Sequence, residues 1–457
     1  MSLTKKLLLA AAAVALCATA AHAQGRQIVS PDTAARLGKD LNPMGGIIAG
    51  EGEVAEWTPM SGVPSGISFN QSTQNPPNPF ASDQPKFRIT AANMGQYEDK
   101  LTEGYKALLR TYDTYFIDVY ESRRTCGYPQ EAYDKMLNNA KVGQLTEDGT
   151  GVLGAIGAHP FPGTTDPVGL LWNHTLGHRG GWKIQRQFAA APVQPNGSYN
   201  LIVVQDDVVL RWQDPSKQRA EDLGNRSLYY ISNTVAPPRL AGNVILVHES
   251  LNASIQPRDA WAYNPGTRRV RRAPDISFDN PGTNTDGMST SDAFDGFNGS
   301  PERYDWTYAG KSVKYVAYNN FDALNSKYAD LLKPRHLNQD LVRYEAHRVN
   351  TVEGKLKSGS RHVYSRRVKH LDEDTGRIVA TELYDSSGNL WRVQEVQSVN
   401  RYHVPVCGPS AEVVYDLQSS RYLALSMSNE EAPVNYTADN LNEDRYTPQA
   451  IRELGKR

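Results

Sequence analysis

The sequence predicts a mainly β protein with accessory helices (α+β), built around one large antiparallel sheet. From Gly181 to the end of the chain, short runs rich in Val, Ile, Tyr and Trp alternate with period two. Short turns at 264–266, 374–376 and 387–389 separate several of these runs, so neighbouring strands should pair antiparallel. Helical periodicity is concentrated before residue 181.

Residues 1–23 have the pattern of a cleavable secretory leader. Lys5 and Lys6 precede an apolar run, and the small residues Ala21 and Ala23 stand where signal peptidase reads the chain. We expect cleavage after Ala23 and a periplasmic mature protein. No later stretch reaches the ~18 consecutive apolar residues that a membrane-spanning helix needs, so we expect no transmembrane span.

The charge balance argues against nucleic acid as a partner. Without Lys5 and Lys6, the 49 basic residues become 47 against 50 acidic ones, a net charge of −3 for the mature chain. Such a balance supplies no broad positive field to attract a polyanion. The composition, with 39% hydrophobic and 22% charged residues, is that of an ordinary globular protein.

We expect two regions after the leader. Residues 24–89 form an extended Gly/Pro-rich arm, and residues 90–457 form a single β domain with a helical insert at 90–180. One packed unit is favoured over a domain break near Gly181, because a large sheet needs its apolar face covered.

The helices expected are 31–37, capped by Ser30, then 90–110, capped by Thr90 or Asn93, and then 130–141, 167–176, 321–332 and 447–454. The strands expected, about twelve in all, are 199–204, 208–213, 228–234, 243–248, 259–263, 268–272, 304–318, 341–352, 361–371, 378–384, 390–401 and 412–426. A sheet of consecutive hairpins either closes into a barrel or curls around helices that fill its concave face.

The motifs associated with cofactors and metals are weak here. The glycine-rich segment 149–154 is followed by prolines and not by a helix that could hold a pyrophosphate. His174 and His178 stand four residues apart, but no Glu lies between them and glycines weaken the helix. The acidic loop 286–305 lacks the spacing of the usual calcium loop. We therefore expect no cofactor, no metal site and no catalytic residue.

Two features allow alternative interpretations. Cys126 and Cys407 would meet an oxidising environment after export, which permits either a disulfide or two separate thiols. The basic run 268–272 is either a rim that recognises an anionic group or a charged strand edge protected from aggregation.

Two hairpins carry a resemblance to a known superfamily. The segment 261–274 joins an aromatic strand, a Pro/Gly turn and a basic return strand, and the segment 371–392 forms a second hairpin. Both resemble hairpins of the periplasmic lipoprotein-carrier (LolA/LolB-like) superfamily. The mature chain as a whole is similar to the family called domain of unknown function 1329 (DUF1329), through 34–41, 275–287, 294–306, 341–345 and 415–418.

The resemblance implies a fold and a class of function. Lipoprotein carriers have a large bent antiparallel sheet, a half-barrel wrapped around helices, with an apolar cavity for acyl chains. Members of the closer family are commonly associated with RND-type exporters. We therefore expect a non-catalytic periplasmic carrier or chaperone of a lipid, a lipoprotein acyl chain or a similar hydrophobic ligand, with an RND-type exporter and outer-membrane components as possible partners. The alternatives are a ligand-free adaptor of such an exporter and an exported hydrolase.

Alternation along the strands nominates ligand contacts without showing which sheet face is concave. The apolar candidates and the two rim cations are Leu246, Trp261, Tyr263, Tyr344, Tyr384, Trp391, Arg269 and Arg271. The Gly/Pro-rich connector 149–162 and the loop 279–300 are candidate lids over the cavity.

Overall fold

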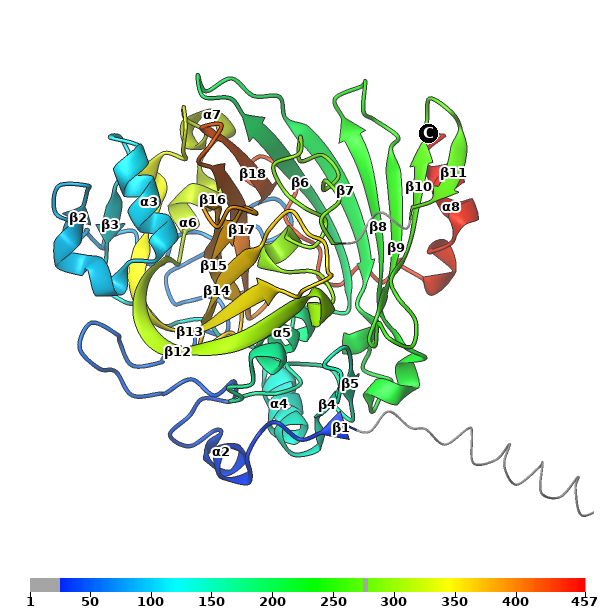
Figure 1. Cartoon of the computed structure of the whole chain (residues 1–457), viewed down its shortest axis with the longest axis horizontal. Helices are drawn as coiled ribbons and strands as arrows, with labels where there is room; N and C mark the ends of the chain where they lie inside the picture. Colours follow the sequence, from blue (N-terminus) through cyan, green and yellow to red (C-terminus); the bar gives the residue numbers. More distant parts are fainter. Residues whose placement is uncertain (1–24, 274–277, 457) are drawn as a thin grey trace, which may run out of the picture.

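A 15-stranded, mainly antiparallel sheet dominates the computed structural model, which describes residues 25–273 and 278–456 (Figure 1). The predicted leader 1–23 lies outside the described residues. The strands of this sheet are β2 (Phe87–Ile89), β3 (Ile117–Val119), β6 (Lys183–Val193), β7 (Ile202–Val209), β8 (Arg226–Ala236), β9 (Val244–Ser250), β10 (Asp259–Asn264), β11 (Arg269–Arg272), β12 (Tyr304–Ala317), β13 (Tyr344–Leu356), β14 (Arg366–Asp372), β15 (Ile378–Tyr384), β16 (Leu390–Arg401), β17 (Val406–Asp416) and β18 (Arg421–Met427). A small second sheet contains β1 (Gly25–Arg26), β4 (Gln144–Thr146) and β5 (Val152–Leu153).

The large sheet is open. Its order is β11-β10-β9-β8-β7-β6-β18-β17-β16-β15-β14-β13-β3-β2, and β12 pairs with β13 beside this path. Neighbours in sequence pair antiparallel from β6 to β11 and from β12 to β18, and the pair β6 and β18 joins the two series. The predicted fold class, a mainly β protein with a large antiparallel sheet and accessory helices, is confirmed.

The α-helices are α2 (Pro31–Arg36), α3 (Glu103–Thr111), α4 (Gln130–Val142), α5 (Pro167–Leu176), α6 (Phe321–Asn325), α7 (Tyr328–Leu331) and α8 (Pro448–Leu454). The 3₁₀ helices are η1 (Met94–Lys100), η2 (Arg211–Gln213), η3 (Ala220–Leu223), η4 (Phe294–Gly296), η5 (Pro301–Arg303), η6 (Gln339–Leu341) and η7 (Glu443–Arg445). In the described part of the chain, no helix has the length and apolarity required to cross a membrane.

Most predicted helices are confirmed, and two predictions needed correction. The helix expected over 321–332 is two short helices, α6 and α7. Ser30 caps α2 by accepting from the Thr33 amide, and α4 and α5 lie where they were expected. The helix predicted over 90–110 is instead η1 followed by α3. Thr102, and neither Thr90 nor Asn93, caps α3 by accepting from the Tyr105 amide.

Three strand predictions were wrong. Strand β6 was missed, because Phe188 is followed by three alanines and buried residues lie on both faces, which hides the alternation. The two strands expected over 199–213 are one strand, β7, followed by η2. The single strand expected over 412–426 is part of the β17–β18 hairpin, which turns near Ser420 with a positive φ of 54°.

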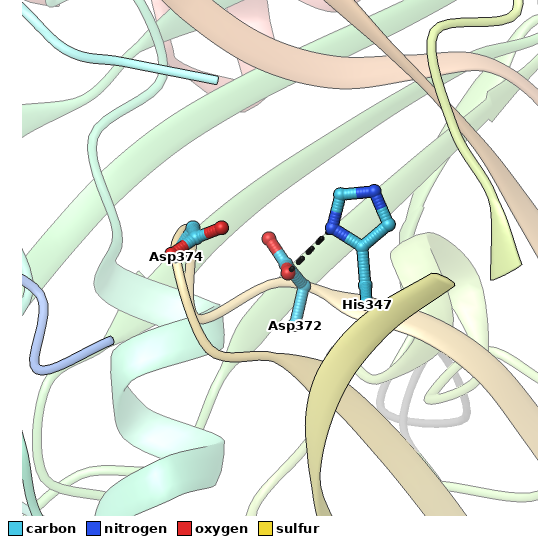
Figure 2. Close-up of side chains that lie close together, drawn as sticks. All are labelled: His347, Asp372 and Asp374. Carbon is cyan, nitrogen blue, oxygen red and sulfur yellow. Dashed lines mark ion pairs between the residues drawn. The ribbon is translucent and has the colours of Figure 1, made fainter. Parts of the chain in front are cut away.

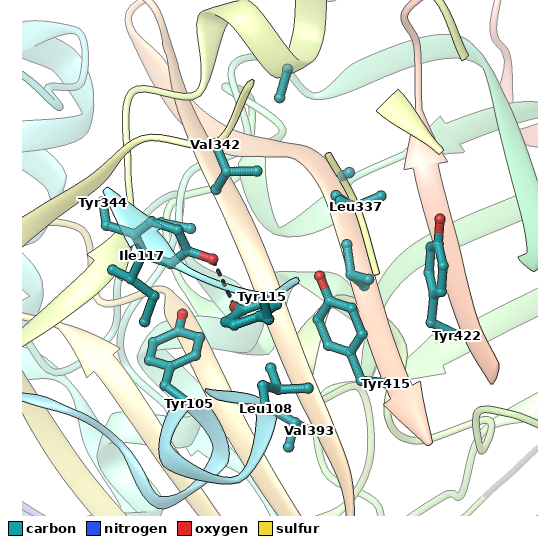
Figure 3. Close-up of a cluster of buried hydrophobic side chains, with 14 of the residues drawn as sticks. Tyr105, Leu108, Tyr115, Ile117, Leu337, Val342, Tyr344, Val393, Tyr415 and Tyr422 are labelled. Carbon is teal, nitrogen blue, oxygen red and sulfur yellow. Dashed lines mark hydrogen bonds between the residues drawn. The ribbon is translucent and has the colours of Figure 1, made fainter. Parts of the chain in front are cut away.

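The outer face of β13 to β18 is filled by an aromatic core. Helix α3 places Tyr105 and Leu108 against Tyr344, Val393 and other fully buried side chains (Figure 3). The Tyr115 and Tyr344 hydroxyl groups lie 2.9 Å apart, so the tyrosines satisfy each other's polar atoms inside the core. We refer to this as the outer face of the sheet.

The opposite, inner face is covered by α5 and by the loop that contains η4. Leu170 and Leu171 of α5 pack with Phe297, Leu371 and Ile378. Next to this contact, the sheet bends, so that β6 to β9 and the ends of β16 and β17 face a common space. That space is the cavity described below.

A disulfide joins Cys126, in the segment after β3, to Cys407 of β17, with the two Cα atoms 5.7 Å apart. It ties the N-terminal half of the chain to the centre of the sheet. Cys407 also borders the inner-face cavity.

Candidate ligand-binding cavity

A cavity of ≈ 340 Å³ lies on the inner face of β6 to β9. Two cross-strand rows form much of its floor. One row consists of Ile184, Val208, Tyr230 and Val247, and the next consists of Arg186, Asp206, Ser232 and Ile245. Phe188 and Val204 continue the floor on the far side of the Arg186 row. The floor is therefore apolar on both sides of one polar row.

The polar row neutralises itself. Arg186 donates to Asp206 at 3.0–3.1 Å, and the Tyr230 hydroxyl donates to the same carboxylate at 2.8 Å. The Arg186 guanidinium also lies 5.0 Å from the centre of the Phe188 ring. An apolar ligand could therefore lie across this row without exposing an unpaired charge.

Loop 282–298 covers the cavity together with two shorter segments. It contributes mainly small polar residues, with Phe294 and Phe297 as its large apolar side chains. The cover is completed by Thr175 and Leu176 at the end of α5, by Gly177 and Arg179 after it, and by Val434 and Tyr436. The predicted lid 279–300 thus lies over the cavity. The other predicted lid, 149–162, does not line it, although the Gly157 amide donates to the carbonyl of Trp212, which is a lining residue.

A charged cluster lies where the loop meets the sheet. The Asp295 carboxylate accepts from Arg179 and, at 3.0 Å, from Arg377. His174 points its Nε2 atom toward Asp295 at 3.7 Å, while its Nδ1 accepts from the Ile378 amide. Burial opposes ionisation of Asp295, but Arg179 and Arg377 hold its pKa well below the usual range. Burial lowers the pKa of His174 to about 3, so this ring is neutral.

Glu412 of β17 borders the same cluster. One carboxylate oxygen accepts from the Asp295 amide at 2.6 Å and the other accepts from the Ser426 hydroxyl at 2.9 Å. Burial, followed by the nearby Asp295 charge, raises the pKa of Glu412 to about 7. Near neutral pH this side chain exchanges a proton inside the cavity wall.

A second cluster, away from the cavity, has the composition of a metal site. His347, Asp372 and Asp374 offer ligand atoms that all lie within 4.8 Å of one another (Figure 2). His347 Nε2 lies 3.1 Å from Glu345, which leaves Nδ1 facing Asp372 Oδ1 at 3.7 Å. Neither facing atom has a hydrogen-bond partner among the described residues.

The surroundings of this cluster favour a structural charge network over a metal site. Arg124 donates to both Asp374 oxygens, at 2.6 and 2.8 Å, so a metal ion would have to displace a buried guanidinium. Burial and the neighbouring Asp374 raise the pKa of Asp372. A proton on this carboxyl group would lie between the two facing acceptor atoms, Asp372 Oδ1 and His347 Nδ1. Arg124 also bonds to the Ile47 and Ala55 carbonyls, so the network fastens the N-terminal segment to the β14–β15 turn.

None of the eight nominated ligand contacts lines this cavity. Leu246, Trp261 and Tyr263 share the outer face of β9 and β10, where they pack with Ile451 of α8. Their neighbours Ile245 and Val247 point into the cavity instead. Alternation along the strands shows which residues share a face of the sheet. It does not show which face is the inner one, because that depends on the C-terminal segment, which packs on the outer face. Ligand contact by the nominated residues stays a prediction.

The remaining nominees occupy the core and the sheet edge. Tyr344 belongs to the outer-face core, where its hydroxyl donates to Glu395 at 2.8 Å. Tyr384 packs under Arg366, and Trp391 donates from its indole nitrogen to Asp416 at 3.0 Å. Arg269 and Arg271 are exposed on β11, the terminal strand of the sheet order.

Sequence reasoning nominated none of the cavity residues as ligand contacts, and those on β6 and the arginines spread along the chain show why. Because β6 was not predicted, Ile184, Arg186 and Phe188 were not considered. Arg377 and Arg401 stand at the start of β15 and the end of β16, where nothing in the local sequence distinguishes them from ordinary surface arginines. The acidic loop 286–305 did draw attention to this part of the chain. Its buried carboxylates are already paired, however, since Asp292 pairs with Arg367 and Asp295 with Arg377.

Comparisons with known proteins identify the family. The model of the family described as "Protein of unknown function (DUF1329)" matches residues 88–452. The chain belongs to the DUF1329 family. It is 42% identical over 466 residues to "Uncharacterized protein PA3922" of Pseudomonas aeruginosa, covering 99% of this chain and 100% of that protein. The family resemblance stated from the sequence is thereby confirmed.

Solved structures similar to this DUF1329 chain have low sequence identity. A putative outer membrane lipoprotein-sorting protein domain from Vibrio parahaemolyticus is 13% identical, with a TM-score of 0.42 over 61% of this chain and 94% of that one. A DUF1329 family protein from Desulfovibrio piger is 15% identical, with a TM-score of 0.41 over 59% and 92%. A LolA superfamily protein from Nitrosomonas europaea, NE2245, is 14% identical, with a TM-score of 0.35 over 58% and 90%.

Proposed function

We propose that this chain is a non-catalytic periplasmic carrier that binds a hydrophobic ligand, such as a lipid or an acyl chain, in the inner-face cavity. The observation that carries the proposal is the cavity of ≈ 340 Å³ between an apolar sheet floor and loop 282–298. This volume falls within the range of about 300–1,000 Å³ typical of small-molecule sites. The leader pattern of residues 1–23 supports export.

The physical gain from such binding is large enough for a carrier. Each methylene group removed from water contributes about 0.8 kcal/mol, so a tail of about eight methylenes gains roughly 6 kcal/mol before ordering costs. Val208 and Val247 offer such a tail continuous apolar contact along one floor row. Loop 282–298 would move aside to admit it.

The two alternatives have less support from the geometry. A hydrolase that used a carboxylate of this cavity would have to compete with protein donors, because both oxygens of Glu412 and the Asp295 carboxylate already accept hydrogen bonds. A ligand-free adaptor would have no use for a cavity of this size. An RND-type exporter or an outer-membrane component remains our proposed partner for ligand transfer.

The carrier proposal can be tested with the neutral apolar dye N-phenyl-1-naphthylamine. We expect the mature wild-type chain to bind it with increased fluorescence, and V208W, which fills the floor of the cavity, to weaken binding at least tenfold. V235W is the matched control, because Val235 is an exposed residue of β8 that does not line the cavity. Absence of dye binding to the folded wild type would sink the carrier proposal and favour the adaptor.

A further inference from the structure

The arginines of the cavity are not evenly matched by carboxylates. Five arginines and three carboxylates line it: Arg179, Arg186, Arg258, Arg377 and Arg401, with Glu249, Asp295 and Glu412. Asp206, beneath the floor, pairs with Arg186, and Glu249 pairs with Arg258. Asp295 serves both Arg179 and Arg377. The excess of positive charge therefore falls on the side of Arg377 and Arg401.

Arg401 is a buried cation without a carboxylate partner. It stands at the end of β16 with 6% of its surface exposed. Its guanidinium donates to the Pro409 carbonyl at 3.0 Å, and in the described ranges no Asp or Glu oxygen lies within ion-pair distance of it. A buried guanidinium normally has an anionic partner, because desolvating the charge is costly.

Arg377 has an unused donor nearby. It is 5% exposed, and its Nη2 atom donates to Asp295. Its Nη1 atom is buried and has no acceptor in the part of the chain that the structure describes. Such a donor costs free energy unless something else accepts from it.

Gly408 keeps space open in front of Arg401. A Cβ atom added to Gly408 would lie 3.4 Å from Arg401 Nη1, so a larger residue would crowd that guanidinium. Arg377, Arg401 and Gly408 all line the cavity, so both arginines border the space in which a ligand would bind.

We propose that the ligand is an anionic amphiphile, whose carboxylate or phosphate head accepts hydrogen bonds from Arg377 and Arg401 beside Gly408. Its apolar tail extends over the floor formed by Ile184, Val208 and Val247. This assignment rests on the proposed carrier function and adds the chemical class of the ligand. A planar guanidinium fork matches both kinds of head group, so the geometry identifies their shared charge.

The test compares three ligands with the same ten-carbon tail: decanoate, decyl phosphate and decan-1-ol. Each is titrated against the wild-type chain as a competitor of N-phenyl-1-naphthylamine. We expect at least one anion to bind 10- to 100-fold more tightly than the alcohol, the range for hydrogen bonds to charged groups. The tighter of the two anions identifies the head group as carboxylate or phosphate.

Variants locate the recognition. R401Q should abolish the preference for the anion while leaving decan-1-ol affinity within about twofold, and R401K should retain part of the preference. R110Q, at an exposed arginine of α3, is the matched control and should change neither affinity, whereas R269Q tests the rim position on β11. If R401Q does not fold, R377K replaces it, because a lysine there keeps a positive charge beside Asp295.

Other outcomes overturn the proposal at different levels. Equal affinity of wild type for alcohol and anions rejects the anionic head but leaves the carrier function standing. Failure of all three ligands and the dye to bind rejects the carrier function itself. Loss of the anion preference in R269Q would move head-group recognition to the sheet edge and reject the assignment to Arg377 and Arg401.

Discussion

The large sheet has a filled half around β13 to β16 and a hollow half around β6 to β9, and only the hollow half forms the cavity floor. In the filled half, the outer face packs against α3, and the inner face of β13 to β15 packs against Leu170 and Leu171 of α5. In the hollow half, the outer face of β7 to β9 packs against the C-terminal segment around Ile451, while the inner face is covered by a loop of mainly small polar residues. The covering segment, more than the strands, therefore decides where a ligand can bind.

Buried charge is arranged differently inside the filled half and at the cavity wall. In the filled half, Arg124, Arg348 and Lys311 surround Glu373 and Asp374 in a closed network. At the cavity wall, Arg377 keeps an unused donor and Arg401 has no carboxylate among the described residues. A closed network stabilises a fixed structure, whereas unmatched donors facing a cavity suit a group that binds and leaves.

The strongest test of this contrast removes one arginine from each half. R124M should reduce the free energy of unfolding by about 3–5 kcal/mol, because it leaves the buried Asp374 carboxylate without its cation. R186M should cost about 1–2 kcal/mol, since Tyr230 still donates to Asp206 and the cavity can admit water. Urea unfolding followed by circular dichroism measures both values, and equal losses would contradict the contrast.

A matched pair of isoleucines tests packing in the same way. Ile117 of β3 is fully buried in the outer-face core, and Ile184 of β6 borders the cavity. I117A should cost about 3–4 kcal/mol of unfolding free energy, whereas I184A should cost about 1–2 kcal/mol because fewer contacts are lost. Similar costs, measured by the same unfolding experiment, would show that the inner face of β6 is packed as tightly as the core.

The sequence predicts the filled half better than the hollow half. The predicted bounds of β15 and β16, 378–384 and 390–401, coincide with the observed ones, because alternating residues and clear turns mark both strands. Strand β6 escapes prediction, since its Ala189–Ala191 segment is buried on both faces and shows no period.

The cavity itself depends on contacts that no local pattern contains. The inner position of Val247, rather than Leu246, follows from α8 packing on the other face, about 200 residues further along the chain. That Arg377 and Arg401 line the same cavity likewise depends on how distant strands come together and not on a local pattern. Sequence analysis therefore predicts the fold class and the covering loop 279–300, but not the residues that line the site.

The test with the smallest expected effect asks whether water reaches the cavity wall when no ligand is bound. Burial raises the pKa of Glu412 to about 7, so the folded chain retains a proton that the unfolded chain releases at lower pH. Its contribution to stability is therefore fully present below the unfolded pKa, near 4.5, and is lost as pH rises through about 7. E412Q does not titrate in this range and should lack that loss.

Relative to wild type, E412Q should thus gain unfolding free energy between pH 5 and pH 7.5, by an amount on the order of 2 kcal/mol. Thermal and urea unfolding at several pH values measure the difference, with E443Q on the surface as the matched control that should show none. If the difference in unfolding free energy between E412Q and wild type stays constant with pH, water reaches Glu412 freely. In that case the inner face of β6 to β9 would be an open, wet groove, and the apolar contribution to ligand binding would have to come from closure of loop 282–298 over the bound tail.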